Sequence, residues 1–308
     1  MSFTRDITMK QLRALSAVVQ TGTVSGAAKI LHVTPPAVSL QLKQFEILAG
    51  IELLERNSNG LTPTAAGQEI LDASKGIDLL LSNCSDSLDN IKGMTSGTVR
   101  VGVISTAKYF APRALAAFKK LHPEIEMNLQ VGNRTETVAA LEAFEFEFAI
   151  MGRPPKQFEV ECAEIGPHPH ILITPPDHPL AGKKGLKPQD LISESFLLRE
   201  PGSGTRAITE NLLVEAGAPL NSGMEMGSNE TIKQAVMAGL GIALISAHTV
   251  SVELEEGRLA WLDVEGFPIE RNWQVVRRSQ KRLMPAGQAL WSFMIENGKS
   301  FLPELPKH

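Results

Sequence analysis

Cysteine is scarce in this sequence, which has only two cysteines among 308 residues. Cys84 and Cys162 lie far apart along the chain and in different predicted elements. A secreted domain stabilised by disulfides has more cysteines at closer spacing. The scarcity therefore excludes a disulfide framework and indicates reduced thiols.

Long hydrophobic runs are also missing. The segment MSFTRDITMKQLRAL has no continuous apolar stretch, which a secretory signal or a membrane span would require. We find no internal repeat of the solenoid kind and no low-complexity tract. We therefore expect a cytoplasmic protein that has no membrane partner.

The chain has no excess of positive charge, since its formal net charge is −4. Residues 1–66, however, hold six basic and four acidic residues, which leaves 24 basic and 30 acidic residues in the remainder. A composition of 43% hydrophobic and 21% charged residues over this length allows two or three domains with cores of their own. A small basic module on an acidic body indicates a localised attraction to DNA.

Residues 23–46, TVSGAAKILHVTPPAVSLQLKQFE, contain two helix starts close together. Thr23 or Ser25 is expected to open the first helix, because both are favourable N-caps and apolar residues follow at helical spacing. Thr34 can cap the second helix. The two prolines after it fit the first helical turn, where the missing amide hydrogens have no intrahelical partner.

The second helix has the pattern of a recognition helix. Val38, Leu42 and Phe45 recur at helical spacing and are expected to face inward, while the other side chains can reach a DNA groove. Two short helices of this kind also form corners of ordinary helical cores, and that alternative stays open here. The predicted DNA-binding residues are Thr23, Ser25, Thr34, Pro35, Pro36, Ser39, Leu40, Gln41, Lys43 and Arg56.

The continuation LAGIELLERNSNGLTPTAAGQEIL predicts a wing. A polar turn at residues 57–60 lies between Leu53 and Leu54 on one side and Leu61 on the other. A short hairpin of this kind can lie along the phosphate backbone, with Arg56 at its base. The wing favours a winged helix-turn-helix over a corner of a helical core.

Residues 64–92 are predicted to form a long helix with a heptad seam. Apolar side chains recur at spacings of seven and four over about three heptads, which favours pairing with a second helix. A single amphipathic helix that lies on its own domain is the alternative. The segment GMTSG at residues 93–97 ends the helix. The predicted dimerisation residues are Ile70, Ile77, Leu81, Cys84, Leu88 and Ile91.

From residue 98 the pattern alternates between strands and helices. The strands TVRVGVI, IEMNLQVG and FEFAIMG, with helical segments between them, predict a βαβαβ unit with a parallel sheet. Ligands of such sheets bind beyond the carboxyl ends of the strands. The predicted ligand-binding residues there are Ser105, Thr106, Asn133, Arg134, Gly152 and Arg153.

A second α/β unit follows, with strands near HILITP, SFLLRE, GMEMGS and GIALIS, and NWQVVRR and the helix at residues 285–297 are expected to return to the first unit. Within it, REPGSGTR at residues 199–206 predicts a loop before a helix start, where backbone amides can bind an anion. A plain turn, with Arg206 paired to a surface acid, is the alternative. The predicted effector-binding residues of this loop are Gly202, Ser203, Gly204, Thr205 and Arg206.

Catalytic and metal-binding chemistry finds little support. The glycine-rich loop lacks the Gly-Lys-Ser/Thr ending that NTPases use, and Ser203 has no assignable His and acid partners. His168 and His170 flank a proline, and no Cys or acidic cluster converges with them in the sequence. We therefore expect no metal, no cofactor and no enzymatic activity.

The motifs QLRALSAVVQTGTVSGAAKILHVTPPAVSLQLKQFE, LLER and AAG resemble the DNA-binding domain of the LysR-type transcriptional regulators in order and spacing. HPLAGKKGLKPQDLISESFLLRE and AGLGIALIS are typical of the same family, so the resemblance covers essentially the whole chain. The chain departs from the family at Pro35 and Leu40, where members often carry Gln and Arg, and at Asn59, where they often carry a basic residue. Fewer polar side chains are therefore expected to contact base edges directly in this chain.

The resemblance implies an α+β protein with a winged helix-turn-helix at residues 1–63 and a dimerisation helix at 64–96. An effector-binding domain at 97–308, similar to periplasmic binding proteins, is expected to have two lobes. Lobe I comprises residues 97–167 and 271–308, and lobe II comprises residues 168–270. Promoter DNA, a small-molecule effector, a second copy of the chain and RNA polymerase are the expected partners, and a homotetramer is the expected assembly.

LLREPGSGTR and VTPPAVSLQLK are most similar to the CbbR group of this family, which regulates carbon-fixation operons. That resemblance implies a phosphorylated sugar, another Calvin-cycle metabolite or NADPH as the effector. A regulator of sulfur or nitrogen metabolism could share the loop, and an enzyme fused to a DNA-binding domain is the alternative from another class.

Overall fold

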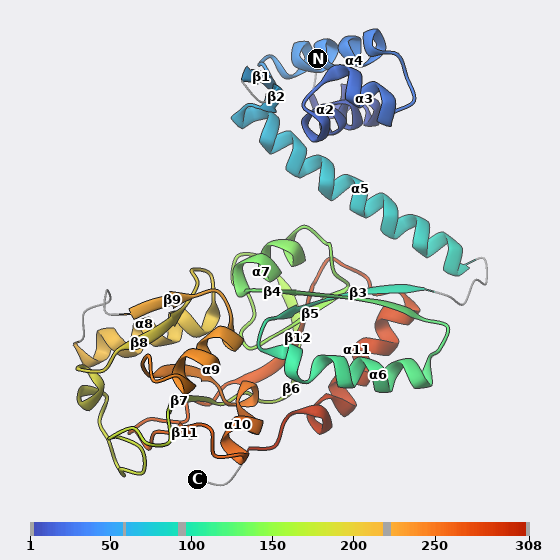
Figure 1. The fold of residues 1–308 in the computed structure, drawn as a ribbon. Helices are drawn as coiled ribbons and strands as arrows, with labels where there is room; N and C mark the ends of the chain where they lie inside the picture. Colours follow the sequence, from blue (N-terminus) through green and yellow to red (C-terminus); the bar gives the residue numbers. More distant parts are fainter. Residues whose placement is uncertain (1–2, 58–59, 92–96, 218–222, 306–308) are drawn as a thin grey trace. The chain divides into compact units, whose positions relative to one another are not determined.

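The computed structural model describes residues 3–57, 60–91, 97–217 and 223–305, which form two compact units (Figure 1). Unit 1 comprises residues 1–86 and unit 2 comprises residues 87–308. Their boundary falls inside the long helix α5 (Ala65–Ile91) and so differs from the predicted divisions at 63/64 and 96/97. None of the described helices is both long enough and apolar enough to cross a membrane.

Unit 1 is a winged helix-turn-helix, as predicted. Thr23 caps α3 by accepting a hydrogen bond from the Gly26 amide. Thr34 occupies the N-cap position of α4, but its side chain makes no capping hydrogen bond, which corrects that part of the prediction; prolines at the first helical positions set the backbone instead. The elements are α1 (Phe3–Asp6), α2 (Met9–Thr21), α3 (Val24–Ile30), α4 (Pro35–Ala49), β1 (Leu54–Asn57) and β2 (Gly60–Pro63).

The core of unit 1 fixes the recognition helix and the wing. The predicted inward side chains of α4, Val38, Leu42 and Phe45, are all buried. The wing is tied to the turn before α3, because the Leu61 amide donates to the Gly22 carbonyl at 2.9 Å. A Cβ atom on residue 60 would lie 2.5 Å from that carbonyl oxygen, so this close approach requires glycine.

The seam predicted along α5 is divided between two environments. Ile70 and Ile77 are half-buried and pack against the core of unit 1, and their role in dimerisation stays a prediction. Leu81 and Leu88 are 49% and 51% exposed, and Cys84 is also exposed. The Ile91 side chain lies outside the described residues. The second half of the seam therefore keeps the apolar surface that a partner helix would cover.

Lobe I of unit 2 is built on a five-stranded sheet with the order β4-β3-β5-β12-β6. The predicted βαβαβ arrangement is confirmed, because β3 pairs in parallel with both β4 and β5. The late strand β12 returns to this sheet as predicted and pairs antiparallel with β5 and β6. The bounds are β3 (Thr98–Ile104), α6 (Ala111–Leu121), β4 (Glu126–Gly132), α7 (Arg134–Glu142), β5 (Phe148–Met151), β6 (Val160–Pro167), β12 (Asn272–Arg278) and α11 (Pro285–Asn297).

Lobe II contains the four strands that the sequence predicts and one more, β11. Strand β7 pairs antiparallel with β10 and β11, while β8 and β9 form a parallel pair that a bridge between Phe196 and Ile242 joins to the segment before β10. The bounds are β7 (His170–Thr174), β8 (Phe196–Arg199), α8 (Gly204–Ala216), β9 (Gly223–Met226), α9 (Asn229–Met237), β10 (Ala243–Ser246), α10 (Ser251–Glu255) and β11 (Ala260–Trp261).

Two chain segments cross between the lobes and pair with each other. The His168 amide donates to the Arg271 carbonyl at 2.6 Å, and the amides and carbonyls of His170 and Ile269 bond in both directions. The Trp273 ring stacks on the His168 ring with centroids 3.7 Å apart, and its Nε1 donates to His248 Nδ1 at 3.1 Å. The crossing is therefore well packed and places residues 168–170 and 271 beside the space between the lobes.

Candidate functional site

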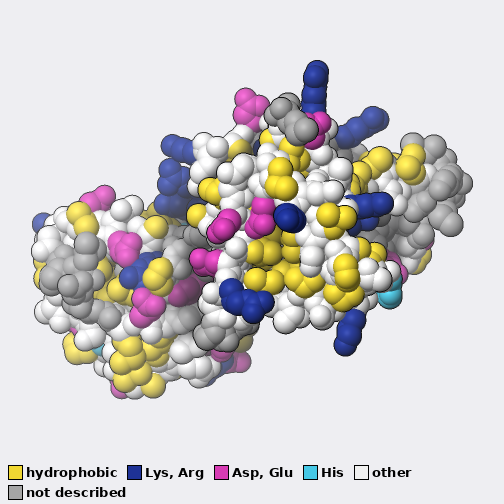
Figure 2. Space-filling view, turned by 90° about the horizontal axis from the view of Figure 1, so that it is seen from above, with side chains coloured by type: hydrophobic (Ala, Val, Ile, Leu, Met, Phe, Trp, Pro, Cys, Tyr) yellow, Lys and Arg dark blue, Asp and Glu magenta, His cyan; other side chains and the backbone are white. Residues whose placement is uncertain are grey.

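The outer face of the helix-turn-helix carries most of the predicted DNA contacts. Gln41 is half-buried, and Leu40 is 54% exposed, as an apolar contact to a thymine methyl group would require. Across the face seen in the space-filling view, Lys and Arg side chains project singly, with apolar and acidic side chains among them (Figure 2). The remaining predicted contacts are exposed, namely Thr23, Ser25, Thr34, Pro35, Pro36, Ser39, Lys43 and Arg56. Their roles on DNA stay predictions.

A depression lies between the start of α3 and the wing. It is lined by Thr23 and Ser25 from one side and by Arg56 and Asn57 from the other. An exposed arginine beside hydroxyl groups is suited to a phosphate of the DNA backbone, which positions the protein without reading sequence. This geometry agrees with the prediction that Arg56 sits at the base of a wing.

Ser39 and Lys43 on α4 are expected to contribute differently to DNA binding. Ser39→Ala should weaken binding to the specific site by roughly 1–3 kcal/mol if its hydroxyl contacts a base edge. Lys43→Ala should weaken binding to DNA of every sequence alike, because a phosphate contact carries no sequence information. It should also reduce the slope of log K against log[salt] by about one. Titrations of operator and scrambled DNA at several salt concentrations measure both quantities.

Lys75→Ala is the matched control for charge, because Lys75 lies on α5 and already pairs with Asp72 at 2.9 Å. Unchanged operator affinity in both the Ser39 and the Lys43 variants would place sequence readout elsewhere on unit 1.

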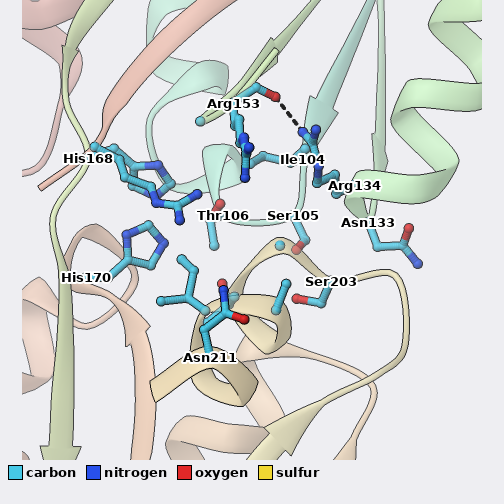
Figure 3. A pocket seen from close by; sticks show the side chains of 16 residues that line it. Ile104, Ser105, Thr106, Asn133, Arg134, Arg153, His168, His170, Ser203 and Asn211 are labelled. Atoms are coloured by element: carbon cyan, nitrogen blue, oxygen red, sulfur yellow. Dashed lines mark hydrogen bonds between the residues drawn. The ribbon is translucent and has the colours of Figure 1, made fainter. Parts of the chain in front are cut away.

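A cleft between the lobes of unit 2 brings most of the predicted effector-binding residues together (Figure 3). It contains about 700 Å³ of empty space, including the part that opens to solvent. The carboxyl ends of β3 and β5 and the start of α7 line it from lobe I, and the start of α8 lines it from lobe II. The predicted residues found there are Ser105, Thr106, Asn133, Arg134, Gly152, Arg153, Ser203, Gly204 and Thr205.

The cleft is strongly cationic. Arg134, Arg153 and Arg271 line it, and none of the described lining residues is acidic. Burial lowers the pKa values of Arg134 and Arg271, and the neighbouring charge of Arg153 lowers both further. Arg134 donates to the carbonyl oxygens of Arg153 and Pro154, which holds its guanidinium at the end of β5. A bound anion would relieve this repulsion and gain charge-assisted hydrogen bonds.

The start of α8 adds backbone donors to the cleft. Ser203 is the N-cap of α8, its side chain makes no capping hydrogen bond, and Gly204 and Thr205 follow as the first helical residues. The first amide hydrogens of a helix have no partner within the helix and lie at its positive end. They therefore supply a second set of anion donors opposite the arginines.

Arg206 does not line the cleft, which corrects the prediction that it faces the effector. Its guanidinium pairs with Glu210 at 2.7 Å and with Glu225, and it donates to the Arg199 carbonyl at 2.9 Å. These carboxylates raise the pKa of Arg206. The side chain lines a depression adjacent to the cleft. The alternative reading of the sequence, an arginine paired with surface acids, is the one the structure has.

Gly202 also lies outside the cleft and lines an adjacent depression. Its carbonyl accepts a hydrogen bond from the Thr135 amide at 3.2 Å, so the loop before α8 is attached to lobe I. The backbone has φ +87°, and a Cβ there would meet Thr135 Oγ1 at 2.9 Å. The glycine therefore serves this close approach of the two lobes.

Three buried histidines lie in or beside the crossing segments near the cleft. Burial lowers the pKa of His170 to about 3, that of His248 to about 4, and that of His168 well below its ordinary value. All three are therefore neutral at physiological pH, and His168 and His170 line the cleft without adding charge. The described residues include no cluster of three or more His, Cys, Asp or Glu that could hold a metal ion.

The lowered histidine pKa values predict a loss of stability in mild acid. Unfolded histidine titrates near pH 6.5, so below that pH the unfolded chain binds protons that the folded chain does not. Stability is fully present above about pH 6.5 and falls toward the folded pKa values, by at most about 1.4 kcal/mol per pH unit for each histidine. Thermal unfolding at about pH 7.5 and about pH 5.5 should show the drop.

His248→Gln keeps an acceptor for Trp273 and removes one titrating group, so it should lose less stability in acid than the wild type. Ser292→Ala, at a half-buried residue of α11 that does not titrate, is the control and should lose as much stability in acid as the wild type. Equal losses in all three proteins would show that His248 does not contribute.

Sequence reasoning missed the part of the cleft that the crossing segments form. His168, His170 and Arg271 come from these segments, and Ile208 and Asn211 come from the second turn of α8. In the sequence, the pattern of the two histidines raises only the question of a metal site. The useful signal was topological, because the segments that join two lobes must border the space between them.

Comparisons with known proteins cover both units. The family model described as bacterial regulatory helix-turn-helix protein, lysR family, matches residues 9–68. The model described as LysR substrate binding domain matches residues 92–299, more than half of the chain.

Curated relatives match along nearly the whole length. The HTH-type transcriptional regulator CbbR of Xanthobacter flavus is 50% identical over 301 residues, which cover 97% of this chain and 90% of that protein. The RuBisCO operon transcriptional regulator of Allochromatium vinosum is 41% identical over 289 residues, 94% and 96% of the two chains. The regulatory domain of CcmR from Synechocystis PCC6803, solved in complex with 2-PG, has 36% identity and a TM-score of 0.62, covering 65% of this chain and 96% of that one.

Proposed function

Since the chain belongs to the LysR family of bacterial transcriptional regulators, we propose that it controls carbon-fixation genes in response to a small phosphorylated metabolite bound in the cleft. As a member of that family it is a DNA-binding regulator and not an enzyme. The observation that carries the proposal is the cationic cleft, with three arginines and a helix start but no acid among its described lining residues.

The composition of the cleft favours a small phosphorylated acid or sugar over NADPH. Among its described lining residues there is no Phe, Tyr or Trp on which an adenine or nicotinamide ring could stack. Donors are abundant, since Ser105, Thr106 and Asn211 add polar groups to the three arginines. The complex of CcmR with 2-PG (2-phosphoglycolate) supports an effector of this chemistry, because that domain is a relative of unit 2.

The carbon-fixation role rests on the relatives. The names CbbR and RuBisCO operon transcriptional regulator belong to proteins that share 41–50% identity with this chain over more than nine tenths of its length. We transfer that role because the matches cover more than nine tenths of the chain and so span both units. No feature of the cleft favours a regulator of sulfur or nitrogen metabolism over this reading.

A ligand in the cleft can act as a switch because it contacts both lobes. Arg134 and Ser105 belong to lobe I, while Ser203 and Thr205 belong to lobe II. A ligand shifts a conformational equilibrium only by its difference in affinity for the two states. An anion held by donors from both sides favours the arrangement in which all of them reach it, and that arrangement would set the DNA-bound form.

The proposed assembly is a homodimer through the exposed half of the α5 seam, at Leu81, Cys84 and Leu88, and pairs of dimers would give a tetramer. Two recognition helices would read two half-sites and double the phosphate contacts. RNA polymerase is a further proposed partner at the promoter, and the cytoplasm is the proposed location.

Two cleft arginines should matter more for effector binding than Arg206. Arg134→Ala and Arg271→Ala should each remove a charge-assisted contact worth roughly 1.5–3 kcal/mol. The affinity for 2-phosphoglycolate should therefore fall about tenfold or more in each variant. Arg206→Ala removes the same charge from outside the cleft and should change the affinity much less. Calorimetric titration of the three variants and the wild type measures these affinities.

A larger loss of effector affinity in Arg206→Ala than in the two cleft variants would contradict the assignment of the cleft as the effector site. A wild-type protein that binds neither 2-phosphoglycolate nor inorganic phosphate would contradict the anionic effector itself.

A further inference from the structure

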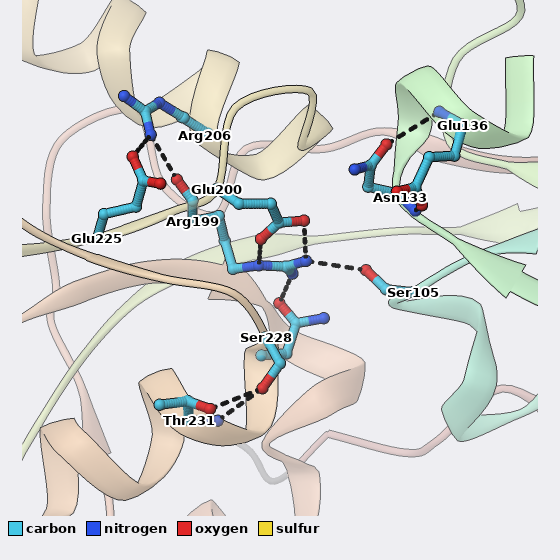
Figure 4. Close-up of polar contacts among 10 residues, drawn as sticks. Ser105, Asn133, Glu136, Arg199, Glu200, Arg206, Glu225, Ser228 and Thr231 are labelled. Atoms are coloured by element: carbon cyan, nitrogen blue, oxygen red, sulfur yellow. Dashed lines mark hydrogen bonds and ion pairs between the residues drawn. The ribbon is translucent and has the colours of Figure 1, made fainter. Parts of the chain in front are cut away.

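Arg199 is a buried arginine at the end of β8 that does not line the cleft. It is 3% exposed, and its guanidinium forms two hydrogen bonds of 2.7 Å with the Glu200 carboxylate. It also donates to Asn229 Oδ1 in lobe II. Its remaining contact crosses the cleft boundary, because Nη2 donates to Ser105 Oγ in lobe I at 3.3 Å (Figure 4).

The direction of this bond determines what Ser105 can offer a ligand. A serine hydroxyl has one hydrogen to donate and two acceptor positions. Arg199 occupies an acceptor position, so the hydroxyl hydrogen points away from the guanidinium. Ser105 lines the cleft, and the hydrogen is therefore available to an acceptor bound there. A hydroxyl that accepts from a cation is also polarised into a better donor.

The charge of Arg199 is balanced where it lies. Glu200 takes two of its donor groups in a bidentate pair. Arg199 therefore does not act as a fourth cation of the cleft. Its effect on an anion would pass through the orientation of the Ser105 hydroxyl.

A second contact holds the same segment of lobe I. Lys233 of α9 is 5% exposed, and its ammonium pairs with Glu253 at 2.8 Å and lies 5.3 Å from the centroid of the Tyr109 ring. Lobe II thus reaches residues 105–109 at both ends of the segment. The position of Ser105 is thereby tied to the arrangement of the lobes.

We propose that Arg199 is a positioning residue for the effector: from lobe II it holds the Ser105 hydroxyl of lobe I in the orientation that donates to the bound anion. The inference rests on the proposed function and adds a residue outside the cleft to it. It also makes the Ser105 contact conditional on the arrangement of the two lobes, since the hydroxyl is oriented only while Arg199 reaches it.

A double-mutant cycle on effector affinity tests this positioning. Calorimetric titration with 2-phosphoglycolate is carried out on wild type, Ser105→Ala, Arg199→Lys and the double variant. Ser105→Ala should weaken binding about tenfold or more. Arg199→Lys should weaken binding about threefold or more, because lysine keeps the positive charge but lacks the planar, forked donors of the guanidinium. In the Ser105→Ala background, Arg199→Lys should change the affinity by less than about twofold, because the group it orients is gone.

Two further variants separate positioning from a general structural role. Ser105→Thr keeps the hydroxyl and should retain affinity within about threefold of wild type. Ser292→Ala on α11 lies outside the cleft and should bind like wild type. If Arg199→Lys does not fold, Arg199→Gln combined with Glu200→Gln removes both charges together. This variant should also weaken effector binding about threefold or more, and by less than about twofold in the Ser105→Ala background.

Additive losses in the cycle, or wild-type affinity in both Arg199 variants, would overturn the positioning role while leaving the effector site intact. Failure of the wild type to bind 2-phosphoglycolate or inorganic phosphate would instead overturn the proposed function and this inference with it.

Discussion

Repulsion among three guanidinium groups is the constraint on which the function of unit 2 depends. Arg134, Arg153 and Arg271 share one cleft, and no carboxylate lies among its described lining residues. Fold stability alone would favour an acid in such a place. The surrounding structure offsets the repulsion among these charges, since backbone carbonyls hold Arg134 and the paired crossing segments hold Arg271. In the proposed function, a bound anion would offset this repulsion and accept charge-assisted hydrogen bonds from the arginines.

The same arrangement explains how occupancy can be sensed. Donors for the anion come from strand ends in lobe I, from the start of α8 in lobe II and from the crossing segments between them. The lobes already touch through Thr135 and Gly202 and through Arg199 and Ser105. Each of these contacts depends on where the other lobe lies. Under the proposed function, ordinary hydrogen bonds would therefore link ligand binding to the arrangement of the lobes.

Local sequence patterns predicted the elements well where one signal dominated. The capping residue and prolines located α3 and α4, and the alternation of strands located the sheet of lobe I with its ligand-binding edge. The pattern was less informative where two partners compete for one side chain. Arg206 follows a loop with the pattern of an anion site, yet its guanidinium pairs with Glu210 and Glu225, and Glu225 belongs to a separate strand. Ile70 and Ile77 fit a heptad seam and also fit the core of their own unit, against which they pack.

The missed residues share a physical reason. His168, His170 and Arg271 become part of the cleft because two segments about a hundred residues apart in the chain cross side by side. No spacing within either segment encodes that meeting. Arg199 was hidden for a similar reason, since its role depends on a serine hydroxyl contributed by the other lobe.

The most direct test of the account is a footprint of the purified protein on the promoter region of the carbon-fixation genes of its source genome, with and without 2-phosphoglycolate. The account predicts protection upstream of the RuBisCO genes and a change in the length or pattern of that protection when the anion is added. Protection that is absent from this region, or identical at saturating effector, would contradict it.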